Sequence, residues 1–187
     1  MPGVIVVGAG PAGMMAAAVA AENGARVTLL EKKEQAGKKL KLTGKGRCNI
    51  TSALEGEVFM SGYAGNGRFL YSALNQFSNQ DLISFFNKRG LATVIERGQR
   101  VFPASGRAED VVAVLYRNML DNGVEIICKR RVQGMEIETS QVKGIKVEGG
   151  VMPCVAAIIT TGGMSYPGTG STGDGYDWAR AAGHRII

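Results

Sequence analysis

One stretch near the N-terminus constrains the fold more than any other, namely residues 4–31, VIVVGAGPAGMMAAAVAAENGARVTLLE. Val4–Val7 is a short β-branched apolar run, which predicts a strand buried on both faces. Three glycines follow with the spacing G-x-G-x-x-G, and they are Gly8, Gly10 and Gly13. Met14–Ala21 carries no charge, which predicts a helix that is buried on several sides, and Gly24 predicts its left-handed end. Arg26–Leu30 then predicts a second strand.

Glycines with this spacing have distinct tasks in proteins that bind dinucleotides. The first allows a tight turn, the second lets the backbone approach a pyrophosphate, and the third lets the helix pack closely on the strand. Pro11 and Ala12 begin the helix, where proline loses no hydrogen bond. Glu31 lies 18 residues beyond the last glycine, where a carboxylate can accept the hydroxyls of an adenosine ribose. The glycines, Pro11, Ala12 and Glu31 are therefore candidate cofactor-binding residues.

These features predict an α/β Rossmann-like domain with a parallel sheet. A carboxylate at Glu31 would repel a 2′-phosphate, so the pattern favours FAD or NAD over NADP. The alternative is an ordinary βαβ unit whose glycines serve only packing.

Length and composition limit the class of protein. A chain of 187 residues can form one α/β domain with a substantial core, and 27 glycines suit a protein rich in turns. Its three cysteines, Cys48, Cys128 and Cys154, are far apart, which disfavours a dithiol motif and fits a reducing compartment such as the cytoplasm. No metal site is expected. No membrane span is expected either, because no apolar run approaches the roughly 20 residues that a span needs.

The stretch 32–52, KKEQAGKKLKLTGKGRCNITS, predicts a long polar loop at the carboxyl end of the second strand, where doubly wound folds bind cofactors. The alternation in KLKLT indicates a little extended structure. Arg47 and Asn49 offer donors to a phosphate or a flavin. A solvated basic loop or a nucleic-acid-binding patch is the alternative. Cys48 is either a reactive thiol beside basic residues or a small residue packed by the loop, and we favour the second.

The run GKKLKLTGKGRCNIT, together with the N-terminal motif, resembles the bacterial FAD-dependent oxidoreductases of the aminoacetone-oxidase-like family. That family also includes proteins assigned as bile-acid reductases, and it belongs broadly to the glutathione-reductase-type flavoproteins. The resemblance continues through SYPGTGSTGDGYDWARAAGH near the end of the chain.

The resemblance implies a noncovalent FAD, with the glycine turn at its pyrophosphate and Glu31 at its ribose. It adds further candidate cofactor-binding residues, which are Thr43, Gly44, Arg47, Cys48, Asn49, Val132, Thr161, Gly162 and Gly163. Lys32 and Lys39 of the basic stretch are also candidates, although Lys32 is more simply a solvated residue. Val132 would approach the adenine through its backbone. The substrate would be a small molecule, with a nicotinamide dinucleotide as a candidate electron donor, and no catalytic residue can be named.

The rest of the chain predicts an insertion and a return to the sheet. Residues of about 53–107 predict helices from Gly67 and from Ser78 or Asn79, with Phe and Leu side chains in the core, and then two short strands. A helix over Ala108–Asp121 follows. Four strands come next, of which the first and last join the parallel sheet and the middle ones form a small antiparallel meander.

A second G-x-G-x-x-G lies near the end of the chain, at Gly168, Gly170 and Gly173. We predict a glycine-rich helix start there rather than a nicotinamide site, because MSYP is not a strand and little chain remains for a partner strand. Ser165, Tyr166 and Ser171 are candidate neighbours of a substrate or flavin. His184 is expected at the surface.

Residues 1–187 are thus expected to be the N-terminal portion of an FAD-binding domain, with a substrate domain to follow. Two rival functions remain, a flavoprotein associated with RNA modification and a simple NAD-binding module. Nucleic acid is the less favoured partner, because no RNA-binding pattern with interleaved aromatic residues is present.

Overall fold

The computed structural model describes residues 2–165 and 167–187, and the chain divides into two compact units. The first unit comprises residues 1–40 and 115–187, and the second comprises residues 41–114. The second unit contains the stretch of about 53–107 that the sequence predicts as an insertion. Helix α5 (Ala108–Asp121) begins in the second unit and ends in the first, and its bounds are those predicted. No helix in the described part of the chain is long and apolar enough to cross a membrane.

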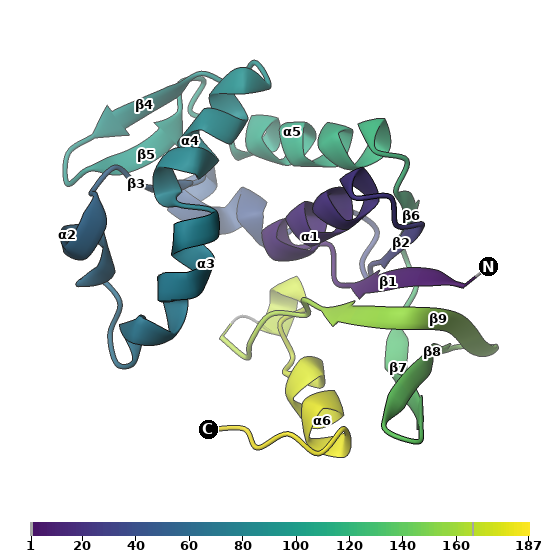
Figure 1. Cartoon of the computed structure of the whole chain (residues 1–187). Coiled ribbons are helices and arrows are strands. Elements are labelled where there is room, and N and C mark those ends of the chain that lie inside the picture. The colour runs from purple at the N-terminus through teal and green to yellow at the C-terminus, as the bar shows by residue number, and fades with distance from the viewer. Residues whose placement is uncertain (1, 166) are drawn as a thin grey trace. The chain divides into compact units, whose positions relative to one another are not determined.

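A six-stranded sheet forms the centre of the first unit (Figure 1). Its strands lie in the order β6 (Glu125–Ile127), β2 (Val27–Leu30), β1 (Gly3–Val7), β9 (Gly150–Ile159), β8 (Gln141–Val147) and β7 (Val132–Glu138). Strands β6, β2, β1 and β9 run parallel, whereas β9, β8 and β7 form an antiparallel meander. The predicted α/β Rossmann-like fold with a parallel sheet and a small meander is therefore confirmed.

Helix α1 (Pro11–Glu22) connects β1 to β2 and packs against both strands. It buries Met14, Ala17 and Ala18, as its uncharged sequence predicts. Gly24, just beyond the C-cap Asn23, has φ of +87°, and the amide of Ala25 donates to the carbonyl of Ala20. A left-handed residue at this position satisfies the last carbonyls of a helix, which explains the glycine.

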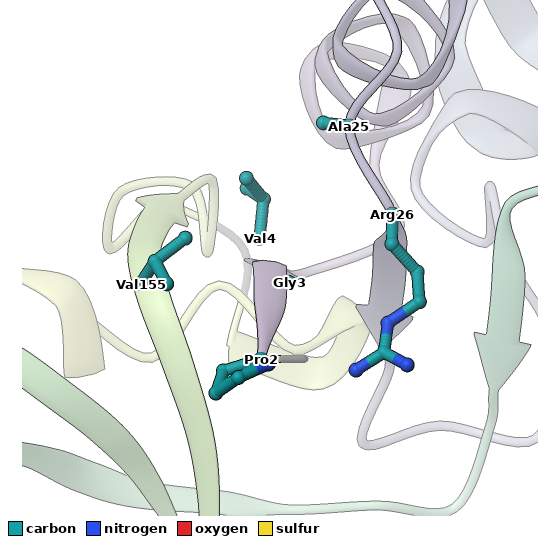
Figure 2. Close-up of a pocket in the computed structure, with 6 residues that line it drawn as sticks. All are labelled: Pro2, Gly3, Val4, Ala25, Arg26 and Val155. Atoms are coloured by element: carbon teal, nitrogen blue, oxygen red, sulfur yellow. The ribbon is translucent and has the colours of Figure 1, made fainter.

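An open hollow of about 420 Å³ lies at the start of β1 (Figure 2). It is lined by Pro2, Gly3, Val4, Ala25, Arg26 and Val155. The glycine turn is at the other end of β1, so this hollow is not part of the candidate site.

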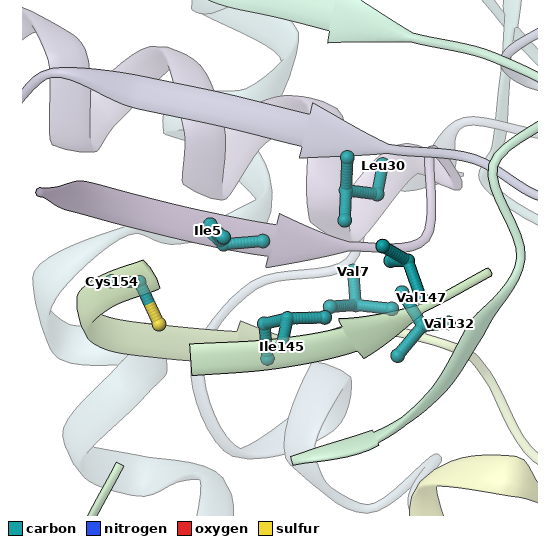
Figure 3. Packing of buried hydrophobic residues seen from close by; sticks show 7 residues of the cluster. All are labelled: Ile5, Val7, Leu30, Val132, Ile145, Val147 and Cys154. Carbon is teal, nitrogen blue, oxygen red and sulfur yellow. The ribbon is translucent and has the colours of Figure 1, made fainter. Parts of the chain in front are cut away.

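The core on one face of the sheet is made by alternate residues of the parallel strands and the meander (Figure 3). Its members are Ile5, Val7, Leu30, Val132, Ile145, Val147 and Cys154. Trp178, from helix α6 (Asp174–Ala181), packs against this cluster. Strand residues two apart share a face, so the same alternation leaves Val6 for the opposite face, where it is also buried.

The second unit contains a three-stranded antiparallel sheet and short helices. The strands lie in the order β3 (Thr51–Ser52), β5 (Arg100–Pro103) and β4 (Thr93–Glu96). The helical segments are η1 (Leu40–Gly46), α2 (Gly56–Met60), η2 (Gly67–Leu70), α3 (Tyr71–Gln76) and α4 (Asn79–Lys88). Ser78 caps α4 in a reciprocal capping box with Asp81, and the buried amide of Asn79 donates to the carbonyls of Ser52 and Leu54. The predicted start of α4 and the hairpin of β4 and β5 are confirmed.

Three details differ from the sequence predictions. KLKLT forms no strand, because residues 40–42 begin the 3₁₀ segment η1, which is kinked at Thr43, Gly44 and Lys45. The returning strand, β9, is longer than predicted: it pairs with β8 along its first part, as a third strand of the meander, and with β1 along its second. Phe69 of η2 is 81% exposed rather than in the core, and neither η2 nor α3 buries any residue. Phe86 of α4 is buried, as expected.

Candidate cofactor site at the carboxyl end of the parallel sheet

The three glycines of the first turn have three different surroundings. Gly8 has φ of +103°, and a Cβ atom there would lie 2.6 Å from the carbonyl oxygen of Thr160. At Gly13 a Cβ atom would lie 1.9 Å from the carbonyl oxygen of Gly8. At Gly10 a Cβ atom would meet no atom within 4 Å. Gly8 and Gly13 are therefore required by the fold itself, whereas Gly10 faces open space, as the approach of a pyrophosphate demands.

Gly10 is also the N-cap of α1, with Pro11 as the first helical residue. Within the described residues, no side chain caps this end of the helix. The amides of Ala12 and Gly13 lie in the first turn, where a helix offers N–H groups and positive dipole charge to an anion. The open space at Gly10 and these amides fit the pyrophosphate of a dinucleotide.

The carboxylate of Glu31 holds the first turn in place. Its Oε2 accepts the backbone N–H of Ala9 at 2.8 Å, and its Oε1 accepts the N–H of Lys33 at 2.8 Å. The carbonyl of Ala9 in turn accepts the N–H of Gly37 at 2.8 Å. Each carboxylate oxygen keeps a further lone pair that can accept a ribose hydroxyl. The structure therefore brings Glu31 to the glycine turn, and its role at the ribose stays a prediction.

The segment after β9 forms a second turn beside the first. The hydroxyl of Thr160 donates toward the carbonyls of Val7 and Gly8, both at 2.9 Å. Thr161, Gly162 and Gly163 follow directly, and Gly162 has φ of +76°. Parallel strands β1 and β9 are neighbours, so the turns that follow them meet at the same sheet edge. The candidates of both turns are thus brought together.

Two residues at this edge of the sheet were not predicted as site residues from the sequence, although each makes hydrogen bonds that hold the turns. Ala9 bonds with both of its backbone groups, and Thr160 joins the two turns through its hydroxyl. Only their positions in the sequence could have indicated these roles, because Ala9 lies inside the glycine motif and Thr160 follows an apolar strand.

Lys32 and Lys39 contact the segment before α6. The ammonium of Lys32 donates to Thr172 at 2.7 Å and to Asp174 at 2.8 Å, and that of Lys39 lies 3.4 Å from the hydroxyl of Ser171. Burial alone would raise the pKa of Asp174, but the hydrogen bonds from Lys32 and Thr172 and the nearby positive charges outweigh it and lower that pKa. Lys32 is thus engaged with protein groups.

The loop candidates of the second unit lie together on its small sheet. The guanidinium of Arg47 pairs with Glu96 and lies 4.3 Å from the ring centroid of Phe102. Gly44 packs against the same ring, since a Cβ atom there would lie 3.1 Å from it. With its amide nitrogen turned toward them, Asn49 donates to the carbonyls of Thr51 and Val101 at 3.0 and 3.2 Å.

Cys48 is fully buried, and its amide donates to the carbonyl of Thr43 at 3.0 Å. Burial raises the pKa of the Cys48 thiol, with a smaller opposing effect from a hydrogen bond with Thr43. A buried thiol with a raised pKa is a packing residue rather than a nucleophile at neutral pH. This agrees with the favoured interpretation of Cys48. The contacts of Thr43, Cys48 and their neighbours with a cofactor stay predictions from the resemblance.

Other candidates contribute less. The side chain of Val132 lies in the core cluster, so only its backbone could reach an adenine. Ser171 is buried beside the second turn, Ser165 is exposed, and Tyr166 lies outside the described residues. His184 is exposed, and its amide donates to the carbonyl of Ala179 after the left-handed Gly183. Among the residues that the structure describes, no group of acidic, histidine or cysteine side chains could hold a metal ion.

Comparison with solved structures gives the same fold. The Mycobacterium smegmatis Sdh1 structure in complex with UQ1 superposes with a TM-score of 0.72 at 18% identity, over 96% of this chain and 38% of that one. At this identity the likeness shows the fold alone.

Two curated relatives are closer in sequence. One is the 3-dehydro-bile acid delta(4,6)-reductase of Clostridium scindens, 33% identical over 97% of this chain and 44% of the relative. Another is the ribosomal RNA dihydrouridine synthase of Haemophilus influenzae, 32% identical over 98% of this chain and 46% of the relative. The chain thus spans less than half the length of these relatives.

The sequence pattern of one protein family, described as the HI0933-like protein Rossmann domain, matches residues 2–187. This match covers both units, and it confirms the flavoprotein family that the motifs predicted. The chain therefore belongs to the family of HI0933-like proteins and matches its Rossmann domain, an FAD-binding domain.

Proposed function

We propose that this chain is the FAD-binding part of a flavin-dependent oxidoreductase. One observation carries the proposal: the open space at Gly10 lies at an uncapped helix N-terminus, beside a turn that Glu31 holds. The pyrophosphate would lie against the amides at the start of α1, and the ribose would bond to Glu31. The second turn, from Thr161 to Gly163, would lie along the flavin half. When bound, the flavin supplies hydride and electron transfer, while the protein supplies binding and orientation.

For the substrate, we propose a carbon–carbon double bond conjugated with a carbonyl group. A delta(4,6)-reductase and a dihydrouridine synthase are both named for adding hydrogen to a double bond, although their substrates differ in size and charge. A reduced flavin can transfer a hydride to such an acceptor. A nicotinamide dinucleotide is the proposed electron donor. No catalytic side chain is assigned.

Titration of the apo-protein with FAD and, separately, with NAD tests the cofactor. We expect saturable binding of FAD, followed by the flavin absorption bands, and much weaker binding of NAD. The variant Gly10→Val serves as the control, because its side chain would occupy the space that the pyrophosphate needs. Preference for NAD, or equal FAD binding by wild type and Gly10→Val, would reject the proposed site.

Ribosomal RNA is the second candidate substrate. The relative named as a ribosomal RNA dihydrouridine synthase supports it, as do the net charge of +6 and the lysine-rich loop after β2. Binding of ribosomal RNA fragments at rising salt would separate the candidates. Contacts with phosphates alone weaken steeply as salt rises, so binding that is lost near physiological salt would count against an RNA substrate.

A further inference from the structure

The segment Gly170–Gly175, just before and at the start of α6, contacts both sides of the proposed cofactor site. On one side lies the loop after β2, and on the other lies the turn after β9. Gly170 and Gly173 of the second G-x-G-x-x-G fall in this segment, and the proposed cofactor binding does not explain them.

Gly170 packs beneath the stems of two lysines. It has φ of +102°, and a Cβ atom there would lie 3.2 Å from Cε of Lys32 and 3.5 Å from Cε of Lys33. A larger residue would thus be strained in its backbone and would shift the stem of Lys32 slightly, while touching that of Lys33. This glycine therefore allows the segment to lie close to Lys32 and Lys33 of the loop after β2.

The charged end of Lys32 also binds the segment Gly170–Gly175. Its ammonium bonds with Thr172 at 2.7 Å and with Asp174 at 2.8 Å, and the hydroxyl of Thr172 donates to the other oxygen of Asp174 at 2.9 Å. The side chains of Lys32 and Asp174 are only 17% and 24% exposed. Salt screens a partly buried pair less than an exposed one, so the attraction between Lys32 and Asp174 persists at physiological ionic strength. Two of the three ammonium protons of Lys32 are already used in this contact.

The opposite side of the segment packs on the second turn. A Cβ atom at Gly175 would lie 2.5 Å from the hydroxyl of Thr161, and one at Gly162 would lie 3.0 Å from the hydroxyl of Ser171. Through Thr160, the second turn is in turn bonded to the carbonyl of Gly8. Direct contacts thus run from the loop after β2, through Gly170–Gly175, to both glycine turns.

We propose that Gly170–Gly175 is a latch that holds the two cofactor-facing turns in their binding arrangement, and that Lys32 is a positioning residue acting through Asp174 rather than a cofactor ligand. The link to cofactor binding rests on the proposed function. Closing the latch before the cofactor arrives reduces the ordering that binding would otherwise require, which raises affinity.

The test uses the whole chain and the variants Lys32→Met, Asp174→Asn and Lys32→Met with Asp174→Asn. Lys38→Met is the matched control, because Lys38 is an exposed lysine of the same loop and its loss removes the same charge. Lys32→Arg tests rescue by a residue that can still pair with Asp174. Hydrogen exchange of residues 160–175 is measured without cofactor, and FAD affinity is measured by titration.

We expect faster exchange of residues 160–175 and about tenfold weaker FAD binding in Lys32→Met and in Asp174→Asn, since each loses a charged hydrogen bond. The double variant should be no worse than either single one, because the two residues act as a unit. Lys38→Met should change neither measurement, and Lys32→Arg should restore both.

Unchanged exchange in Lys32→Met and Asp174→Asn would overturn the latch. Weaker FAD binding in Lys32→Met alone, with Asp174→Asn like wild type, would make Lys32 a direct ligand and overturn the positioning role. A wild-type chain that does not bind FAD would reject the proposed function instead, and the exchange measurement would then decide the latch by itself.

Discussion

The three glycines of the first turn should respond differently to the smallest substitution, Gly→Ala. In Gly13→Ala, the new methyl group would lie 1.9 Å from the carbonyl oxygen of Gly8 and 2.6 Å from the hydroxyl of Thr160. Both partners are held, because the N–H of Gly8 donates to the carbonyl of Leu30 and the Thr160 hydroxyl bonds to the carbonyls of Val7 and Gly8. Overpacking typically costs about 1–3 kcal/mol. An overlap with backbone belongs at the upper end, so we expect a loss of about 3 kcal/mol in the free energy of unfolding.

In Gly10→Ala, the methyl group would meet nothing, and φ of −75° is ordinary for alanine. The weaker capping by alanine and the reduced entropy of its unfolded chain oppose each other, so the free energy of unfolding should change by less than about 1 kcal/mol. The methyl group would nevertheless enter the space proposed for the pyrophosphate. We expect FAD affinity to fall on the order of tenfold or more, which corresponds to the loss of about one charged hydrogen bond.

Thermal unfolding and FAD titration of both variants measure the two effects. For a chain of this length, about 3 kcal/mol lowers Tm by roughly 6–12 °C. Gly13→Ala should show that drop, and Gly10→Ala should keep the Tm of the wild type within about 4 °C while binding FAD poorly. If Gly10→Ala bound FAD like the wild type, or if Gly13→Ala unfolded at the wild-type temperature, the assignment of separate tasks to these glycines would be refuted.

Four further variants or conditions extend these expectations. Glu31→Gln turns an amide group toward one of two backbone donors, so denaturant unfolding should show a loss of about 1–3 kcal/mol, with weaker FAD binding. Leu29→Ala opens a cavity at a fully buried site and should cost about 2–5 kcal/mol by the same assay. Cys48 should resist alkylation at neutral pH until the chain unfolds, which peptide mass spectrometry can follow. Because folding lowers the pKa of Asp174, its contribution to the free energy of unfolding is complete above about pH 4 and is lost as the pH falls further. Fluorescence of Trp178, the single tryptophan, should therefore change below about pH 4 in the wild type and not in Asp174→Asn.

Local patterns were sufficient for much of the fold. The order of β1, glycine turn, α1 and β2 follows from hydrophobic runs, an uncharged helix and a left-handed glycine, which are all properties of neighbouring residues. The bounds of α5 and the start of α4 at Ser78 follow for the same reason. The prediction of extended structure over KLKLT was wrong. Alternation over so few residues is weak evidence, and Gly44 and Gly46, which follow closely, both adopt positive φ.

The sequence by itself determined which residues could form a dinucleotide turn and where the acidic residue of that turn should lie. Only the tertiary structure decided what each of them contacts. Gly10 and Gly13 look alike in the sequence, yet one faces open space and the other a carbonyl oxygen. Lys32 meets Asp174 across 142 positions, and Thr160 meets Gly8 across 152, through the pairing of β1 with β9 and the packing of α6 on the sheet. The spacing of residues along the chain predicts local geometry only, because contacts between distant segments form only when the sheet assembles.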